Sequence, residues 1–304
     1  PPMFELWIPL TVAAAFFQNL RSALQKHLKA HLSTAGATYV RFLYAWPFAV
    51  FYVWGLVEFG GYAVPAVSRK FLIYCFLGGL SQIIFTFLLI WLFSIKNFAV
   101  GTTYSKTDTA QVAFLGLLIL GDTLSAVAAL AIAIGLIGVM VLSMAETHIS
   151  ARNLITGLGE KPTVIGLVCG AFLGAAVVFY RGGALSLGGD GFIIQAAFTL
   201  AVSVVMQTVM MGAYLAVRER DQLRAVIVHW RPSLLVGVAG VLASIFWFSA
   251  FTLQNAAYVR ALGQIELIFT FIASVVFFRE KINKLEFAGI IFITGGILIL
   301  VVAG

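Results

Sequence analysis

The sequence carries little charge for its length. Of its 304 residues, 10% are charged and 62% are hydrophobic, whereas an average soluble domain carries about 25% charged residues. The mean hydropathy is +1.04. This scarcity of charge excludes a soluble enzyme and a disordered chain. A chain this long and this apolar must bury most of its surface in lipid.

Cysteine and the common catalytic motifs are also scarce. Cys75 and Cys169 lie in apolar runs, which predicts core residues and excludes a secreted disulfide scaffold. The sequence has no glycine-rich phosphate loop, no GxSxG and no HExxH. His27 and His31 are four residues apart without a third ligand nearby, which favours a solvated helix end over a metal site. We therefore expect a protein that is not an enzyme, with no cofactor and no metal.

Long hydrophobic runs dominate the chain. A membrane-spanning helix needs about 20 mostly apolar residues, and the runs between polar breaks predict ten such helices. The most charged break is residues 218–231. The fold class predicted is therefore an all-α polytopic membrane protein. The ten runs are roughly 5–25, 37–58, 69–94, 98–119, 123–145, 162–184, 191–217, 232–253, 256–277 and 283–303.

The two halves of the chain resemble each other. Segment 93–142 aligns with segment 251–300 at a constant offset of 158. The pattern predicts a first five-helix repeat over 1–147 and a second over 162–304, joined by 148–161. An odd number of spans per repeat forces the two repeats into opposite orientations. Matched positions are Phe93 with Phe251, Asn97 with Asn255, Lys106 with Gln264, Asp108 with Glu266, Asp122 with Glu280, Gly138 with Gly296 and, at an offset of 160, Arg21 with Arg181.

Each half ends in a span, a short acidic turn and a glycine-bearing span. The turns read Gly121-Asp122-Thr123-Leu124 and Arg279-Glu280-Lys281-Ile282. With this arrangement the chain resembles the drug/metabolite transporter superfamily, in its EamA-like ten-helix branch, which usually has Gly-Glu-Arg at the turn. The resemblance implies two inverted five-helix repeats and a secondary transporter. It does not specify the substrate, because members are similar to exporters of amino acids, aromatic compounds and vitamins, and nucleotide-sugar transporters share the fold.

Basic residues mark the predicted loops. The loops after odd-numbered spans hold twelve of them, whereas those after even-numbered spans hold only Arg69 and Lys70. The positive-inside rule therefore places both termini outside the cytoplasm, and the family resemblance implies the reverse. We expect an integral protein of the bacterial inner membrane. The arginine-rich segment 218–231 is then a topology signal or a contact with anionic lipid rather than a nucleic-acid site.

Seven charged residues fall inside the predicted spans. A charge at the bilayer centre costs at least ~2.5 kcal/mol on insertion scales, so such residues are functional candidates. Five are basic and two are acidic, and this excess favours a substrate that carries a carboxylate. The alternative is that the arginines near span ends snorkel to the headgroups. The seven are Arg21, Arg41, Lys106, Asp108, Arg181, Arg260 and Glu266.

The fourth predicted span is polar over three turns, from Gly101 to Gln111. No lipid-facing helix carries polar residues on all sides, so this span is expected to line a wet cavity. Helical spacing puts Tyr104, Asp108 and Gln111 on one face and Thr102, Lys106 and Thr109 on an adjacent face.

The ninth predicted span carries a related polar set, and we predict that these two spans face each other and build the substrate site. Asp108 and Glu266 are candidate proton carriers, because burial favours the protonated form of a carboxyl group. The alternative is a structural ion pair, for example Lys106 with Asp108 or Glu266. The related set is Tyr258, Arg260, Gln264 and Glu266, and further candidates for substrate contact are Arg21, Arg181, Gln18, Asn19, Gln82, Tyr44, Trp46, Trp91, Tyr180, Trp247 and Phe248.

The sequence as a whole favours a carrier that exports a small metabolite, such as an amino acid or a related carboxylate. Alternating access, driven by proton coupling or exchange, is the expected mechanism. The alternatives are a nucleotide-sugar or organic-anion exchanger on the same fold, a membrane-embedded enzyme, and an accessory subunit. A stripe of Gly166, Gly170 and Gly174 allows close helix approach, either in a homodimer or inside the monomer.

Overall fold

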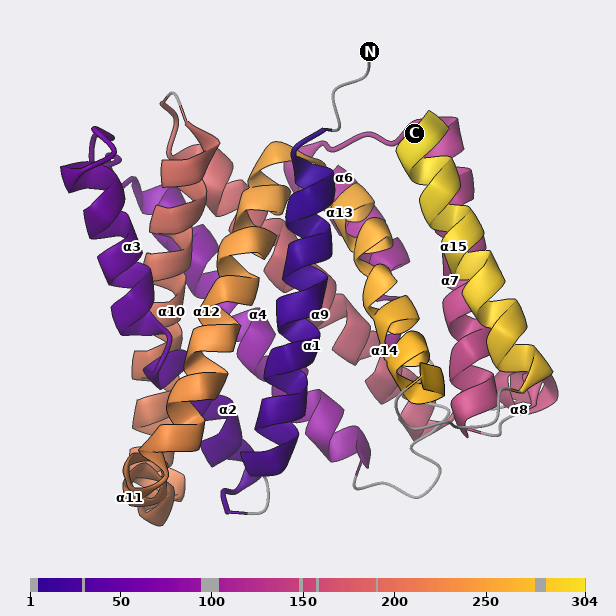
Figure 1. The fold of residues 1–304 in the computed structure, drawn as a ribbon, viewed down its shortest axis with the longest axis horizontal. Helices are drawn as coiled ribbons and strands as arrows, with labels where there is room; N and C mark the ends of the chain where they lie inside the picture. Colours follow the sequence, from indigo (N-terminus) through magenta and orange to yellow (C-terminus); the bar gives the residue numbers. More distant parts are fainter. Residues whose placement is uncertain are drawn as a thin grey trace. The chain divides into compact units, whose positions relative to one another are not determined.

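The computed structural model describes residues 5–28, 31–93, 104–147, 150–156, 159–189, 191–276 and 283–303. Regular structure in these ranges is helical throughout (Figure 1), which confirms the all-α class. Within the same ranges, seven helical segments are long and apolar enough to cross a membrane. The count of ten spans and the two-repeat arrangement stay predictions.

Every predicted run contains helix, and three of the runs are divided. The connecting segments also hold two short helices, α8 (Ala151–Thr156) and α11 (Arg220–Val228). The helices of the runs are α1 (Trp7–Leu28), α2 (Thr34–Leu43), α3 (Trp46–Glu58), α4 (Arg69–Phe93), α6 (Asp108–Leu120), α7 (Ala126–Thr147), α9 (Lys161–Ser186), α10 (Phe192–Arg218), α12 (Trp230–Leu253), α13 (Ala256–Gly263), α14 (Ile265–Val276) and α15 (Lys284–Ala303).

The divisions have local causes. The chain turns between α2 and α3, and Pro47 lies in the first turn of α3, where a missing N–H leaves no hydrogen bond unmade. The other two divisions are a turn at Lys106–Thr107, just before α6, and a turn at Gln264, between α13 and α14. Lys106 and Gln264 are matched positions of the predicted repeat, so both halves interrupt a helix at the same place.

Two compact units organise the chain. Unit 1 comprises residues 1–83 and 179–253, and unit 2 comprises residues 84–178 and 254–304. Each unit therefore draws on both halves of the sequence. In unit 1, α1 lies along α12, while α10 packs against α2, α3 and α12.

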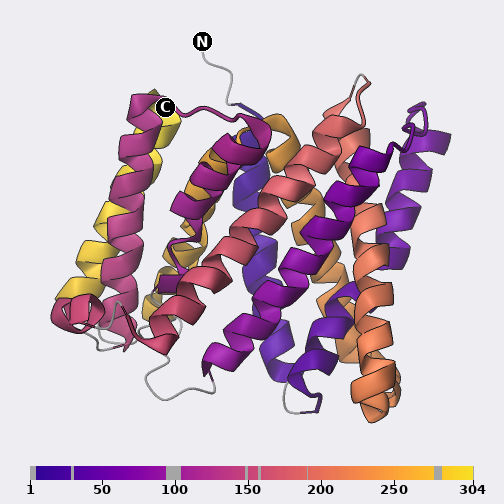
Figure 2. The same cartoon turned by 180° about the vertical axis from the view of Figure 1, so that it is seen from behind.

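In unit 2, α7 and α15 pack side by side along their length (Figures 1 and 2). Glycine permits this contact. A Cβ atom added at Gly138 would lie 2.7 Å from the backbone nitrogen of Ile293, and one added at Gly296 would lie 2.8 Å from the carbonyl oxygen of Ala131. The two backbones therefore touch at the matched glycines, a packing mode common between membrane helices.

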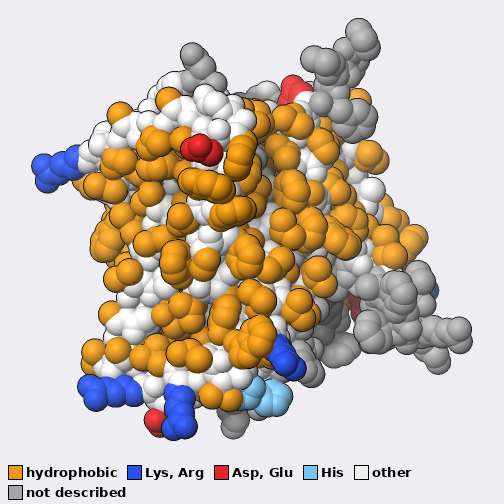
Figure 3. Space-filling model, turned by 60° about the vertical axis from the view of Figure 1, so that its left-hand side comes forward, with side chains coloured by type: hydrophobic (Ala, Val, Ile, Leu, Met, Phe, Trp, Pro, Cys, Tyr) orange, Lys and Arg blue, Asp and Glu red, His pale blue; other side chains and the backbone are white. Residues whose placement is uncertain are grey.

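Large apolar side chains remain exposed on the helices. On the face drawn in Figure 3, hydrophobic side chains cover a broad area, and the Lys and Arg side chains lie toward its edges. Phe51, Trp54 and Val209 are among the exposed apolar residues. Exposed apolar surface on this scale is foreign to a monomeric soluble protein, and it agrees with helices that face lipid.

Candidate functional site

A buried ion pair lies at the centre of the polar side chains of unit 2. Asp108 is the first residue of α6, and Arg260 lies on α13, one turn before the division at Gln264. The Arg260 guanidinium donates to Asp108 Oδ2 from Nε at 3.0 Å and from Nη2 at 2.6 Å. The side chains are 11% and 4% exposed. These charge-assisted bonds neutralise both residues inside the unit.

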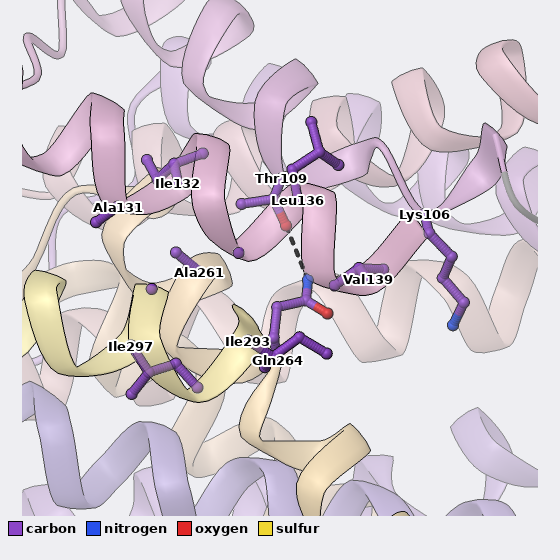
Figure 4. A pocket seen from close by; sticks show the side chains of 12 residues that line it. Lys106, Thr109, Ala131, Ile132, Leu136, Val139, Ala261, Gln264, Ile293 and Ile297 are labelled. Atoms are coloured by element: carbon purple, nitrogen blue, oxygen red, sulfur yellow. Dashed lines mark hydrogen bonds between the residues drawn. The ribbon is translucent and has the colours of Figure 1, made fainter. Parts of the chain in front are cut away.

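Neutral hydrogen bonds surround this ion pair. Gln264 Nε2 donates to Thr109 Oγ1 at 2.9 Å, which joins the division between α13 and α14 to the first turn of α6 (Figure 4). Gln111 Nε2 donates to Thr107 Oγ1 at 2.8 Å, and the Thr107 hydroxyl donates to the Tyr104 carbonyl at 2.8 Å. We call Thr107, Asp108, Thr109, Gln111, Arg260 and Gln264 the polar cluster of unit 2.

The two carboxylates of the predicted site occupy equivalent places. Asp108 opens α6, and Glu266 is the second residue of α14, so each lies in the first turn after an interrupted helix. The positive end of a helix dipole favours a carboxylate at this position. Glu266 is partly buried and adds to the negative potential at Arg260. One guanidinium is therefore placed in the field of two carboxylates.

A small recess borders the polar cluster. Its polar lining comes from Lys106, Thr109 and Gln264, and its apolar lining comes from α7, α13 and α15 (Figure 4). Tyr104 is buried against Met140 and Met144. The apolar lining residues are Ala131, Ile132, Gly135, Leu136, Val139, Ala261, Ile293, Gly296 and Ile297.

The structure brings most of the predicted polar residues together. The fourth and ninth predicted spans do face each other, through α6 and α13. The partner of Asp108 is Arg260, whereas an ion pair of Asp108 with Lys106 had been the expected alternative. Tyr258 lies apart and donates to Ser125 Oγ at 3.4 Å. Thr102 lies outside the described residues. The role of these side chains in binding a substrate stays a prediction.

Unit 1 holds a second polar network, formed by Gln82 on α4, Tyr180 on α9 and Gln207 on α10. Gln82 Oε1 accepts from Gln207 Nε2 at 2.6 Å and from the Tyr180 hydroxyl at 3.1 Å. Gln207 Nε2 also donates to the Tyr180 oxygen at 3.0 Å. Gln207 is not among the residues predicted from the sequence, although an amide in the middle of a long apolar helix is a signal that marks it.

The other candidates of unit 1 tie its helices together. Trp247 Nε1 donates to Gln18 Oε1 at 2.9 Å, which links α12 to α1. Arg181 donates to the Phe251 carbonyl at 2.6 Å, in the last turn of α12, where a cation complements the helix dipole. Arg21 is buried, and its Cδ lies 3.4 Å from the place of a Cβ atom at Gly240 on α12.

Comparisons with known proteins give a family and a fold. Residues 164–302 match the model of the EamA-like transporter family. A solved crystal structure of a protein matches this chain with 12% sequence identity and a TM-score of 0.69. The match covers 98% of this chain and 98% of that protein's chain. This likeness shows a shared fold. No curated protein matches the chain.

Proposed function

Because residues 164–302 belong to the EamA-like transporter family of the drug/metabolite transporter superfamily, we propose that the chain exports a small carboxylate-bearing metabolite, such as an amino acid. Transport proceeds by alternating access in the bacterial inner membrane. Proton coupling or exchange drives it.

The observation that carries the proposal is the pair of interrupted helices in unit 2. Secondary transporters place substrates and coupling ions where membrane helices are discontinuous, because helix ends carry partial charges and backbone groups without partners in the helix. Here the interruptions at Lys106–Thr107 and Gln264 adjoin a buried Asp108–Arg260 ion pair. A charge pair is costly to keep at membrane depth, so a transport role accounts for it better than packing does.

Asp108 and Glu266 supply the coupling in this proposal. A proton that binds Asp108 cancels its charge and leaves the Arg260 guanidinium without its buried counter-ion, which is unfavourable unless a new anion replaces it. Glu266, the second carboxylate that acts on Arg260, is then the replacement. Protonation and a change of ionic partner are thereby linked in one step. The remaining polar residues assigned to substrate contact in this unit are Thr102, Tyr104, Lys106, Gln111, Tyr258 and Gln264.

Counterflow tests the proposal. The purified chain is reconstituted in proteoliposomes loaded with one compound at a time from a panel of amino acids and organic anions, and the uptake of the same labelled compound is measured. We expect counterflow for at least one carboxylate-bearing compound. The absence of counterflow across the panel contradicts a carboxylate substrate.

Two neutral variants test the coupling role. Proton-driven transport should be lost in Asp108→Asn and in Glu266→Gln, while Asp221→Asn on the exposed helix α11 should behave like the unchanged chain. Proton-driven transport that persists in both Asp108→Asn and Glu266→Gln contradicts the coupling role and leaves the carrier proposal intact.

A further inference from the structure

Unit 1 contains a recess that the polar cluster of unit 2 does not share. It is formed by α2, α4, α10 and α12, and its cavity volume is about 20 Å³, which is room for one or two water-sized groups. Its polar lining comes from Arg41, Gln82, Gln207 and Ser244, and Phe42 and Phe248 add aromatic surface.

Arg41 brings a cation into this recess without a bonded counter-ion. Within the described part of the chain, nothing accepts a hydrogen bond from its guanidinium, and no carboxylate lies within 4.0 Å of it. The guanidinium packs near the ring of Phe42, 5.4 Å from the ring centre. The last turn of α2 provides a favourable dipole, but its carbonyl groups make no hydrogen bond to Arg41 in the described structure.

The neighbouring polar side chains provide two further groups that can form hydrogen bonds with a ligand. The Gln82 oxygen and the Tyr180 hydroxyl are occupied by each other and by Gln207 Nε2. Among the described residues, the Ser244 hydroxyl has no hydrogen-bond partner, and nothing donates to Gln207 Oε1. The recess therefore presents a guanidinium, a hydroxyl and one amide oxygen to whatever enters it.

The charges of unit 1 favour an anionic ligand in this recess. The described carboxylates of this unit belong to Glu5, Glu58, Glu219 and Asp221, all at helix ends rather than within the apolar segments. A second arginine stem converges on Arg41, because Arg21 Cδ and Arg41 Cγ lie 3.4 and 3.8 Å from one point above Gly240. A guanidinium inside an apolar helix bundle favours a nearby anion.

We propose that the Arg41 recess is a binding subsite for the carboxylate group of a small organic acid. The carboxylate accepts hydrogen bonds from the Arg41 guanidinium, whose planar donor set suits it, and from the Ser244 hydroxyl. Gln207 Oε1 accepts a hydrogen bond from any donor next to that carboxylate. The subsite rests on the proposed transport function and names the ligand chemistry that function requires.

Direct binding tests the subsite with two isosteric probes, propanoate and its neutral amide, propanamide. Equilibrium dialysis with the purified full chain should give a carboxylate affinity about 10- to 100-fold higher than that of the amide, as expected for one charged hydrogen-bond partner. Arg41→Gln should abolish this preference, while amide binding stays within about threefold. Arg69→Gln is the matched control, because Arg69 is an exposed arginine at the start of α4.

A preference that survives Arg41→Gln, or that is absent from the unchanged chain, overturns the subsite. If Arg41→Gln does not elute as a single folded species, Arg41→Lys decides instead. Lysine keeps the charge but loses the planar fork, so carboxylate affinity should fall roughly threefold to tenfold with amide binding unchanged. Unchanged carboxylate affinity in Arg41→Lys also overturns the subsite.

Counterflow separates this inference from the proposed function. A chain that binds propanoate through Arg41 but transports nothing in the panel supports the subsite and contradicts the transporter proposal. A chain that transports a carboxylate, yet keeps its carboxylate preference in Arg41→Gln, supports the transporter proposal and contradicts the subsite.

Discussion

The two units differ in the balance of basic and acidic residues inside their predicted spans. Of the seven charged residues singled out inside the predicted spans, the four in unit 2 are two basic and two acidic residues, whereas the three in unit 1 are all arginines. The positive excess inside the predicted spans therefore belongs entirely to unit 1. The residues of unit 2 are Lys106, Asp108, Arg260 and Glu266, and those of unit 1 are Arg21, Arg41 and Arg181.

This difference separates two roles for a buried charge. The Asp108–Arg260 pair is neutral as it stands, so it is suited to a change of state when a proton arrives. In unit 1, Arg181 is engaged by a backbone carbonyl, while Arg41 lines a recess with no bonded anion among the described residues. A charge that already has a partner is suited to coupling, and a charge that lacks one is suited to binding.

The largest expected effect comes from breaking the neutral pair of unit 2. Asp108→Ala leaves the Arg260 guanidinium buried without its partner, which should lower the free energy of unfolding by about 3–5 kcal/mol. The double variant Asp108→Asn with Arg260→Gln removes both charges and should recover most of that loss. Unfolding in detergent measures both, and an Asp108→Ala protein as stable as the unchanged chain would show that the pair is not buried.

The next largest effect concerns the backbone contact between α7 and α15 in unit 2. Gly138→Ala places a methyl group against the backbone of α15, 2.7 Å from the Ile293 nitrogen, and should cost about 1–3 kcal/mol through overpacking. Gly135→Ala, on the same helix, meets nothing within 4 Å and should cost nothing. Equal melting temperatures for the two variants would refute the backbone contact between α7 and α15.

A smaller effect is expected from the neutral network of unit 1. Tyr180→Phe removes the hydroxyl shared by Gln82 and Gln207 and should cost roughly 0.5–1.5 kcal/mol. Tyr52→Phe is the control, because its hydroxyl makes no hydrogen bond within the described residues. Thermal unfolding compares the two, and a greater loss in Tyr52→Phe would speak against the network.

The smallest effect on stability is expected for the charge in the recess of unit 1, and it compares the two units most directly. Arg41→Gln removes a charge without a bonded partner, so the melting temperature should stay the same or rise. Asp108→Ala, in comparison, should lower it clearly. A loss of stability in Arg41→Gln as large as that in Asp108→Ala would mean that Arg41 already has an internal anion.

Much of the helical framework follows from the sequence, because apolar runs of sufficient length leave the backbone few alternatives in lipid. The apolar pattern could not locate the turns at Lys106–Thr107 and Gln264, since both lie inside runs long enough to span. The predicted repeat aligns these two positions with each other, so it indicates that they are equivalent, which hydropathy alone does not.

The site could be predicted only in part. Helical spacing put Asp108 on a polar face and the repeat pointed to α13, but choosing Arg260 over Lys106 as its partner requires the packing of α6 against α13. Arg41 was visible as an intramembrane charge, and Gln82 as a polar side chain. Their recess depends on Gln207 and Ser244 from α10 and α12, which are distant in sequence and unremarkable by themselves.

The central claim is that binding charge and coupling charge reside in different units. The most direct test is the apparent KM and maximal rate of proton-driven transport for the carboxylate that the panel identifies. Arg41→Gln should raise KM by about tenfold or more with a nearly unchanged maximal rate. The charge-neutral Asp108→Asn, Arg260→Gln double variant should lose the maximal rate, with KM within about twofold of the unchanged chain. A change in the same kinetic parameter in both variants would contradict this division of roles. So would a lost maximal rate in Arg41→Gln together with a raised KM in the double variant.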